Sequence, residues 1–183
     1  DPAITIRLKV AGEANTYLLA WTTTPWTLPS NMALAVGAEF AYVRVKDKMD
    51  IYYLAKDRLA SYYKKPEEYE LLAEVKGTEL VGLRYEPLFL FFADKAKEGA
   101  FRVVAADFVT TEDGTGIVHI APGFGEDDYR LGQTAGIPAV CPVDAEGRFT
   151  DEVPDYKGRD VKEADPDIIR RLKAEKKLIY HAT

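Results

Sequence analysis

The sequence predicts a mainly-β domain, a β-barrel with a few short peripheral helices. Short segments that alternate apolar and polar residues recur along the chain, and only about three segments have a helical pattern. The strand-like segments do not alternate regularly with helical ones, which argues against a doubly wound parallel sheet and favours a barrel. The sequence contains no repeat, linker or low-complexity tract, so we expect a single domain over residues 1–183.

The first strand has the clearest pattern. Ile4, Ile6, Leu8 and Val10 alternate with polar residues, as on a half-buried strand. A turn over residues 11–15 and a returning strand complete a hairpin. Pro87 has no amide hydrogen, so the mostly extended segment around it is expected at a sheet edge. The predicted strands are 4–10, 17–21, 32–36, 41–45, 51–55, 70–75, 84–92, 101–105, 116–120 and 178–181.

The helical segments are short. Residues 56–63 are expected to form a helix closed by Pro66, and residues 76–82 a turn or a short helix. Residues 125–135 have acidic side chains in the first turn and Gly136 just past the end, which is typical of a helix. The last helix is expected to open at Asp165-Pro166, a cap followed by proline at the first helical position, and to run to about Lys177.

The composition indicates a globular domain without a membrane span. Hydrophobic residues make up 47% and charged residues 30% of the chain. The longest apolar run, residues 88–93, is too short to cross a bilayer. The net charge of −6 argues against a general nucleic-acid coat protein. A single cysteine, Cys141, favours a reducing, cytoplasmic setting, and the scarcity of Asn and Gln favours a thermophilic source.

One motif is rich in hydroxyl groups. The run from Trp21 to Asn31 contains four threonines and a serine. Pro25 and Pro29 are expected to hold it out of a helix, as an extended loop. Such a loop can hydrogen-bond a phosphate, a ribose or a carbonyl oxygen. From the residues alone, a strand end followed by a proline turn explains the motif equally well.

A second motif covers residues 113–129. It contains a Gly-Thr-Gly turn, a strand that ends in His119, an Ala-Pro-Gly loop and the acidic run Glu126-Asp127-Asp128. The acidic residues suit a helix N-terminus, and glycines let the backbone approach a neighbour closely. A turn, a strand and a helix start therefore account for most of this motif without a function. They explain less well why a histidine stands just before the loop.

Together the two motifs resemble those of isoleucyl-tRNA synthetase editing domains, in class I synthetases. Trp-Thr-Thr-Thr-Pro-Trp-Thr-Leu-Pro-Ser-Asn is similar to their threonine-rich motif, whereas valyl and leucyl relatives typically have Thr-Thr-Arg-Pro. Gly-Thr-Gly-Ile-Val-His and Gly-Glu-Asp-Asp-Tyr are similar to the second editing motif, with Asp128 at the position of its essential aspartate. Phe124 departs from the pattern, because many relatives have histidine there. The resemblance covers the whole chain.

The resemblance implies a closed β-barrel of the valyl, isoleucyl and leucyl editing type, cut from a larger, bacterial synthetase. It implies hydrolysis of valine from mischarged isoleucine tRNA and of valyl-adenylate, with isoleucine excluded by size. The implied partners are the 3′ end of that tRNA, valyl-adenylate and the rest of the synthetase. The implied catalytic residues are Asp128, Thr22, Thr23 and Thr24. The implied substrate-binding residues are Trp21, Trp26, Asn31, His119 and Asp128.

Specific roles follow from the chemistry of that substrate. A carboxylate is the natural partner of its ammonium, which points to Asp128. His119 would form a wall of the side-chain pocket, the threonines would contact the carbonyl, the ribose or the attacking water, and Trp26 would lie near the adenosine or in the core. His119, Cys141 and His181 lack a metal-ligand spacing, so we expect no metal and no cofactor.

Two alternatives stay open at this point. The first is an editing domain of the valyl or leucyl type, which the details of the threonine motif disfavour. The second is a non-catalytic tRNA-binding module, in which the basic residues 170–177 of the last helix contact phosphate. A solvated, charged helix face explains those residues as well.

Overall fold

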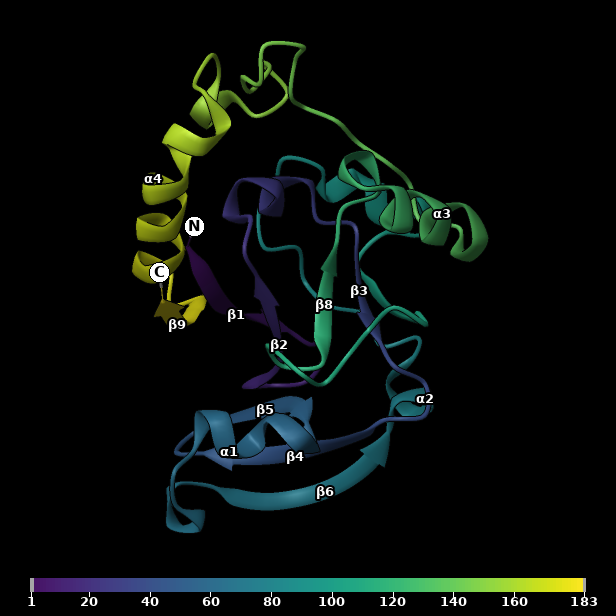
Figure 1. Cartoon of the computed structure of the whole chain (residues 1–183), viewed down its shortest axis with the longest axis vertical. Coiled ribbons are helices and arrows are strands. Elements are labelled where there is room, and N and C mark those ends of the chain that lie inside the picture. Colours follow the sequence, from purple (N-terminus) through teal and green to yellow (C-terminus); the bar gives the residue numbers. More distant parts are fainter. Residues whose placement is uncertain (1, 183) are drawn as a thin grey trace.

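The computed structural model describes the backbone of residues 2–182 and the side chains of residues 2–180. Within this described range, nine strands form one mixed sheet, and four short α-helices lie around it (Figure 1). The strands are β1 (Ala3–Lys9), β2 (Thr16–Thr22), β3 (Ala33–Val36), β4 (Ala41–Asp47), β5 (Asp50–Ala55), β6 (Glu70–Lys76), β7 (Arg102–Ala105), β8 (Ile117–Ile120) and β9 (Leu178–Ala182). The helices are α1 (Leu59–Tyr62), α2 (Gly77–Leu80), α3 (Glu126–Ala135) and α4 (Val161–Ala174).

The sheet branches at β2. One edge of this strand pairs with β1 along its whole length, in the predicted hairpin. The other edge pairs with β5 near its start, at Thr16–Leu18, and with β8 at Trp21. Strands β4, β5 and β6 consequently diverge from β8, β3 and β7, and Figure 1 shows the first group with α1 below the rest of the sheet. The divergence places the end of β2 and the loop before β8 at one junction.

The sheet is open, so the predicted closed barrel is wrong. The strand order β6-β4-β5-β2-β8-β3-β7 ends at two free edges, and off this path β1 pairs with β2 and β9 pairs with β1. The segment expected to be extended over residues 84–92 forms only two isolated bridges, Val10 with Tyr85 and Arg84 with Arg102. Pro87 has no amide hydrogen with which to continue this pairing. The segment therefore spans the gap between β1 and β7 without becoming a closing strand.

The last helix also differs from its prediction, because α4 begins earlier. The Asp160 carboxylate accepts hydrogen bonds from the amides of Lys162 and Glu163, at 3.1 and 3.2 Å, and so caps the helix at Val161. Pro166 lies inside the helix rather than at its first position. Its missing amide leaves only the carbonyl of Lys162 without a helical partner. The cap therefore decides where the helix starts, and the helix ends at Ala174.

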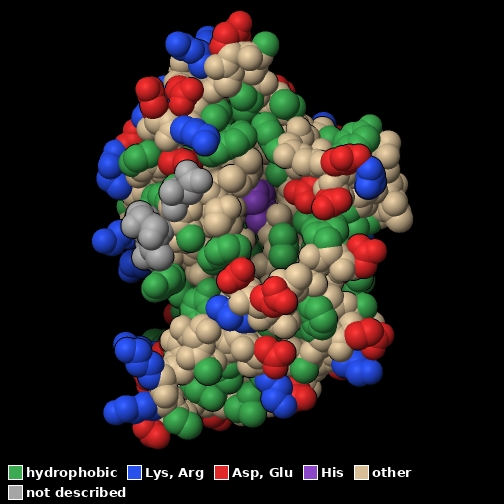
Figure 2. Space-filling view, viewed as in Figure 1, with side chains coloured by type: hydrophobic (Ala, Val, Ile, Leu, Met, Phe, Trp, Pro, Cys, Tyr) green, Lys and Arg blue, Asp and Glu red, His purple; other side chains and the backbone are tan. Residues whose placement is uncertain are grey.

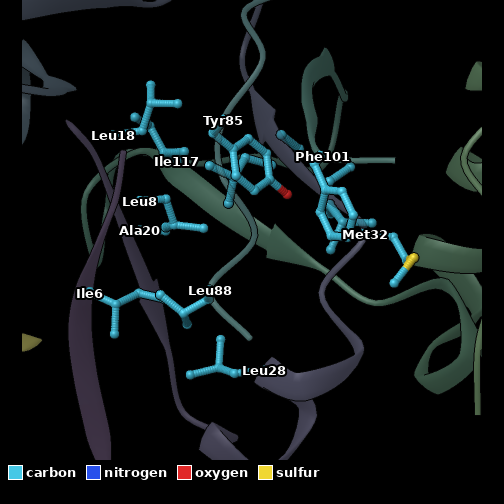
Figure 3. Close-up of a cluster of buried hydrophobic side chains, with 14 of the residues drawn as sticks. Ile6, Leu8, Leu18, Ala20, Leu28, Met32, Tyr85, Leu88, Phe101 and Ile117 are labelled. Carbon is cyan, nitrogen blue, oxygen red and sulfur yellow. The ribbon is translucent and has the colours of Figure 1, made fainter. Parts of the chain in front are cut away.

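The core lies between the strands and α4. Figure 3 shows side chains from β1, β2 and β8 packed against Leu28 and Met32 of the connection after β2. Tyr85 and Phe101 belong to the same cluster, with ring centroids 6.1 Å apart. At roughly 25 cal/mol for each Å² of buried apolar surface, this cluster supplies the main driving force for the fold. It also fixes the connection after β2, which carries the threonine motif.

Candidate functional site

A cavity of about 340 Å³ opens at the junction where β2, β8 and α3 meet. Figure 2 shows a histidine at the base of a hollow in this face, with acidic side chains to the right of the hollow and below it. Both sequence motifs contribute to the lining, although they lie about 90 residues apart in the sequence. The lining residues are Trp21, Thr22, Thr23, Thr24, Thr27, Phe108, Thr110, Asp113, Gly114, Thr115, Gly116, Ile117, Val118, His119, Ala121, Phe124 and Asp128.

The threonine tract forms one wall of this cavity and is not extended throughout. It leaves β2 at Thr22 and enters a 3-10 helix over Pro25–Ser30, with Pro25 in its first turn. The expectation that the prolines keep the motif out of a helix is therefore wrong, because proline at a helix start loses no needed amide. The tight turn brings the hydroxyls of Thr22, Thr24 and Thr27 together, with Thr24 Oγ1 at 3.1 Å from Thr27 Oγ1.

His119 lies at the base of the cavity and is 92% buried. It is held by β8, which pairs it with Leu34 of β3. Its Nε2 lies 2.8 Å from Thr27 Oγ1, and its Nδ1 lies 2.8 Å from Asn31 Nδ2. Burial lowers the pKa of His119 from 6.5 to about 4, so the ring is neutral at pH 7. A neutral ring fixed on both nitrogens forms a rigid wall.

Asn31 lies behind the cavity wall, since it contacts His119 but is not among the lining residues. Its Nδ2 donates a hydrogen bond of 2.9 Å to the carbonyl of Ala33, and its Oδ1 accepts one of 2.5 Å from the Tyr85 hydroxyl. The structure thus connects Asn31 to the site through His119. Its predicted contact with a substrate stays a prediction.

Asp128 lies at the more open side of the cavity, in the first turn of α3. Its Oδ2 accepts a hydrogen bond of 3.0 Å from the amide of Ala121, in the loop that follows β8. Burial raises the pKa of Asp128, with a smaller contribution from Asp127, while the Ala121 amide lowers it. The carboxylate is therefore aimed by the loop that begins just after His119, and it shares the cavity with the threonine wall.

The two tryptophans of the motif have different positions. Trp21 lines the cavity, next to Gly114. Trp26 is not among the lining residues and packs on the core and edge-on against Phe124, with ring centroids 5.3 Å apart. Phe124, whose role the sequence left open, itself lines the cavity. Trp26 thus supports the wall through Phe124, and its predicted proximity to an adenosine stays a prediction.

A further wall of the cavity comes from residues that the sequence analysis did not select. Phe108, Thr110 and Asp113 line it from the loop before β8. Arg58 fixes that loop by donating hydrogen bonds of 2.8 Å and 3.2 Å to the carbonyls of Gly114 and Glu112. The Gly-Thr-Gly turn was the available signal, because a loop that needs glycine for close approach often borders a site.

Gly116 shows why this turn requires glycine. Its φ is +78°, and a Cβ added there would lie 2.4 Å from the Cβ of Ala55 in β5. The loop is therefore pressed against β5, where the amide of Ala55 donates a hydrogen bond of 2.7 Å to the carbonyl of Thr115. This contact fixes the loop wall of the cavity at the point where β5 and β8 diverge.

The site offers hydroxyl groups, a neutral imidazole and carboxylates, a set suited to an ester or amide substrate with a cationic group. In the part of the chain that the structure describes, no three His, Cys, Asp or Glu side chains are placed to hold a metal ion. The side chain of His181 lies outside the described residues, and the absence of a metal and of a cofactor stays a prediction. Across residues 2–182, no helix is long and apolar enough to cross a membrane.

The sequence is similar over its full length to part of bacterial isoleucine–tRNA ligases (isoleucyl-tRNA synthetases). It is 55% identical to the protein of Bdellovibrio bacteriovorus and 51% identical to that of Treponema denticola, with all of this chain covered in both cases. The chain spans about a fifth of the length of these relatives, 18% and 20%. No protein-family model matches it. These relatives do not bear on the predicted thermophilic source.

The fold is that of a synthetase editing domain. The cytosolic leucyl-tRNA synthetase editing domain of P. falciparum is 10% identical, with a TM-score of 0.72 and full coverage of both chains. That of P. knowlesi is 15% identical, with a TM-score of 0.73 and coverage of 100% of this chain and 97% of the other. At these identities the likeness concerns the fold alone.

Proposed function

We propose that this chain is the editing domain of an isoleucyl-tRNA synthetase and hydrolyses valine from mischarged isoleucine tRNA and from valyl-adenylate. The similarity to isoleucine–tRNA ligases and the editing-domain fold support the parent enzyme and the type of domain. The cavity supports the reaction, because it combines a carboxylate, a wall lined with hydroxyl groups and a rigid base formed by His119. The partners are then the 3′ end of the tRNA, valyl-adenylate and the rest of the synthetase, in the cytoplasm.

The observation that carries this proposal is that Asp128 and His119 line the same cavity at different depths. Asp128, nearer the opening, accepts the α-ammonium of the aminoacyl group through charge-assisted hydrogen bonds. His119, at the buried base, limits the space for the side chain that follows the ammonium into the cavity. The fixed ring admits the branched side chain of valine and excludes the additional methylene of isoleucine.

A second site of this kind has an energetic reason. One methylene in an apolar pocket contributes only about 1–3 kcal/mol to discrimination, a limit for which this enzyme family is itself the standard example. A synthetic site that accepts isoleucine cannot reject valine by more than that. The editing cavity reverses the test, because here the larger side chain meets His119.

The hydrolysis needs no covalent enzyme intermediate. A water oxygen adds to the ester carbonyl carbon, the bond from that carbon to the ribose oxygen breaks, and one water proton ends on the ribose hydroxyl. An aminoacyl ester is labile, so orienting the water and the carbonyl accounts for much of the rate. Thr22, Thr23 and Thr24 are the groups on this wall that orient them.

A pair of neighbouring carboxylates tests the proposal. We expect Asp128→Ala to lower kcat/KM for valine release from valine-charged isoleucine tRNA by roughly a hundredfold, since it removes a hydrogen bond to a charged group. Asp127→Ala is the matched control, because Asp127 is exposed and does not line this cavity. Asp127→Ala should keep the melting temperature within about 2 °C of the original, because Asp127 is exposed. Asp128→Ala should stay folded but melt about 2–4 °C lower, since it removes the acceptor of the Ala121 amide.

Three results would contradict the proposal in different ways. Normal valine release by Asp128→Ala removes Asp128 from ammonium recognition. Preferential release of threonine from valine tRNA indicates a valyl-type editing domain. Salt-dependent tRNA binding without release of any amino acid indicates a binding module.

A further inference from the structure

Tyr85 is buried in the core, yet its hydroxyl belongs to the hydrogen-bond network of the site. The residue is 97% buried, and Figure 3 shows it among apolar side chains. That hydroxyl donates to Asn31 Oδ1 at 2.5 Å. Burial raises the pKa of Tyr85 well above its usual range, so it stays a donor. Because the Tyr85 hydroxyl donates, the Asn31 atom that it contacts must be the amide oxygen.

The Ala33 carbonyl assigns the other side of this amide. A carbonyl oxygen can only accept, so the atom of Asn31 that lies 2.9 Å from it must be the nitrogen. Two different partners, Tyr85 and Ala33, therefore impose the same orientation on Asn31. In this orientation Nδ2 also donates to Nδ1 of His119, at 2.8 Å.

The orientation of Asn31 determines the tautomer of His119. Because Nδ1 accepts from Asn31, the single proton of the neutral ring is on Nε2. Nε2 then donates to Thr27 Oγ1 at 2.8 Å. Asp113 and Asp128 are the charged groups that share the cavity with the ring, and neither has a hydrogen bond to it among the described residues.

The donors and acceptors in the threonine wall can be assigned in the same way. Thr27 Oγ1 donates its one hydrogen to the carbonyl of Thr24 at 2.8 Å, so the contact of 3.1 Å with Thr24 Oγ1 requires Thr24 to be the donor. The hydrogen of the Thr24 hydroxyl is therefore directed inward, to Thr27. Towards the cavity, which it lines, Thr24 presents oxygen lone pairs.

We propose that Tyr85 and Asn31 are positioning residues for hydrolysis: they hold His119 in the Nε2–H tautomer and so leave the Thr27 hydrogen for the carbonyl of Thr24, a bond that keeps the turn in which the Thr24 hydroxyl accepts a hydrogen bond from the attacking water. This inference rests on the proposed function for the identity of the reaction. Neither residue lines the cavity, so both act through His119. His119 then has two separable properties, its shape as a wall and the direction of its hydrogen bonds.

Asn31→Asp separates these properties, because it keeps the shape of the side chain and removes the hydrogens that Asn31 donates. An aspartate carboxylate cannot donate to Nδ1, so Nδ1 takes the proton, and Nε2 becomes an acceptor that competes with the Thr24 carbonyl for the single hydrogen of Thr27. We expect kcat for valine release to fall by about ten- to a hundredfold. The discrimination between valine and isoleucine should change by less than about threefold, because the wall keeps its shape.

A pair of tyrosine variants gives a second test, in case Asn31→Asp destabilises the fold. Tyr85→Phe leaves Asn31 Oδ1 buried without its donor, and we expect kcat to fall by about tenfold. Tyr63→Phe is the matched control: it removes the same atom from a hydroxyl that bonds Asp47 at 2.7 Å, in the part of the molecule formed by β4 and β6. The control should keep the original kcat.

The tautomer itself can be measured without a substrate. Nitrogen-15 NMR of the histidine-labelled chain at pH 7 should show a proton on Nε2 of His119, with His119→Gln assigning its signals among the two histidines. In Asn31→Asp the proton should appear on Nδ1. If the chain released no valine, the proposed function would fail, while this spectrum would still support or reject the positioning. A proton on Nδ1 in the unchanged chain, or normal kcat in both variants, overturns the inference.

Discussion

The two sides of the cavity are organised differently. On the inner side, Thr24, Thr27, His119 and Asn31 form a continuous hydrogen-bond network, in which both nitrogens of the imidazole have partners. On the outer side, Asp128 has one hydrogen bond among the described residues, from the Ala121 amide, and it is only half-buried. On the inner side the imidazole thus has its hydrogen-bond partners without a ligand, whereas on the outer side the Asp128 carboxylate can still accept hydrogen bonds from a ligand.

This difference shows how the work of recognition is divided. A buried network that is fully satisfied is rigid, which suits a wall that measures size and a group that orients water. A carboxylate with an open oxygen gains most of its interaction when a cation arrives. Burial favours the neutral form of both side chains, because it lowers the pKa of His119 and raises the pKa of Asp128. An ammonium would reverse that shift for Asp128 only, since His119 has its partners already.

The largest effect that should distinguish the two sides is a pH-dependent loss of stability on the inner side. Burial lowers the pKa of His119 from 6.5 to about 4. Between these values the unfolded chain binds a proton that the folded chain does not, so stability is complete above pH 6.5 and is lost as the pH falls towards 4. At 1.36 kcal/mol for each pKa unit, the loss amounts to about 3 kcal/mol.

Denaturant titrations at pH 7 and pH 4.5 measure this loss, and His119→Gln separates it from the titration of carboxylates. The free energy of unfolding of the original chain should fall by about 2–3 kcal/mol more than that of the variant between these two pH values. Equal pH dependence in both chains would mean that His119 is accessible to protons, and the inner side would not be closed.

The next effect concerns size selection. His119→Ala removes the ring from the base of the cavity, and we expect the release of isoleucine relative to valine to rise by about ten- to a hundredfold, the range that one methylene contributes. The loss of the His119 hydrogen bonds slows the release of both amino acids, while Asp128 and its Ala121 contact are untouched, so the ratio reports the wall alone. Competition between valine-charged and isoleucine-charged isoleucine tRNA measures the ratio directly. An unchanged ratio would remove His119 from the wall.

The sequence was informative where a motif carries its own chemistry. Thr22, Thr24, His119 and Asp128 were selected from two motifs, and the structure brings them to one cavity. The strand with strict alternation, β1, was also predictable, because Ile4, Ile6 and Leu8 of its alternating sequence are all buried. In both cases the determinants lie within a few residues of one another.

The sequence was less informative where partners are far apart in the chain. The direction of the His119 network depends on Tyr85, which is 54 residues from Asn31 and has no pattern of its own. The open sheet depends on whether a short segment continues its pairing beyond Pro87, which its extended composition did not reveal. The start of α4 was placed at Asp165-Pro166, whereas the hydrogen bonds that fix it come from Asp160.

The smallest effect belongs to a second carboxylate on the outer side. Asp113 lines the cavity but is exposed, on the loop that Arg58 fixes through backbone carbonyls. Asp113→Asn preserves that loop and removes one charge, whose attraction to an ammonium is screened by water and salt. We expect kcat/KM for valine release to fall by no more than about threefold at low salt, and less at 0.5 M salt.

Measuring kcat/KM of Asp113→Asn at two salt concentrations tests which carboxylate contacts the ammonium. A salt-sensitive decrease of this size means that Asp113 acts at a distance and that Asp128 alone contacts the ammonium. A salt-independent decrease as large as that of Asp128→Ala would place the ammonium at Asp113 instead. The ammonium would then bind at the loop before β8, where the Gly-Thr-Gly turn holds Asp113, and α3 would serve to close the cavity.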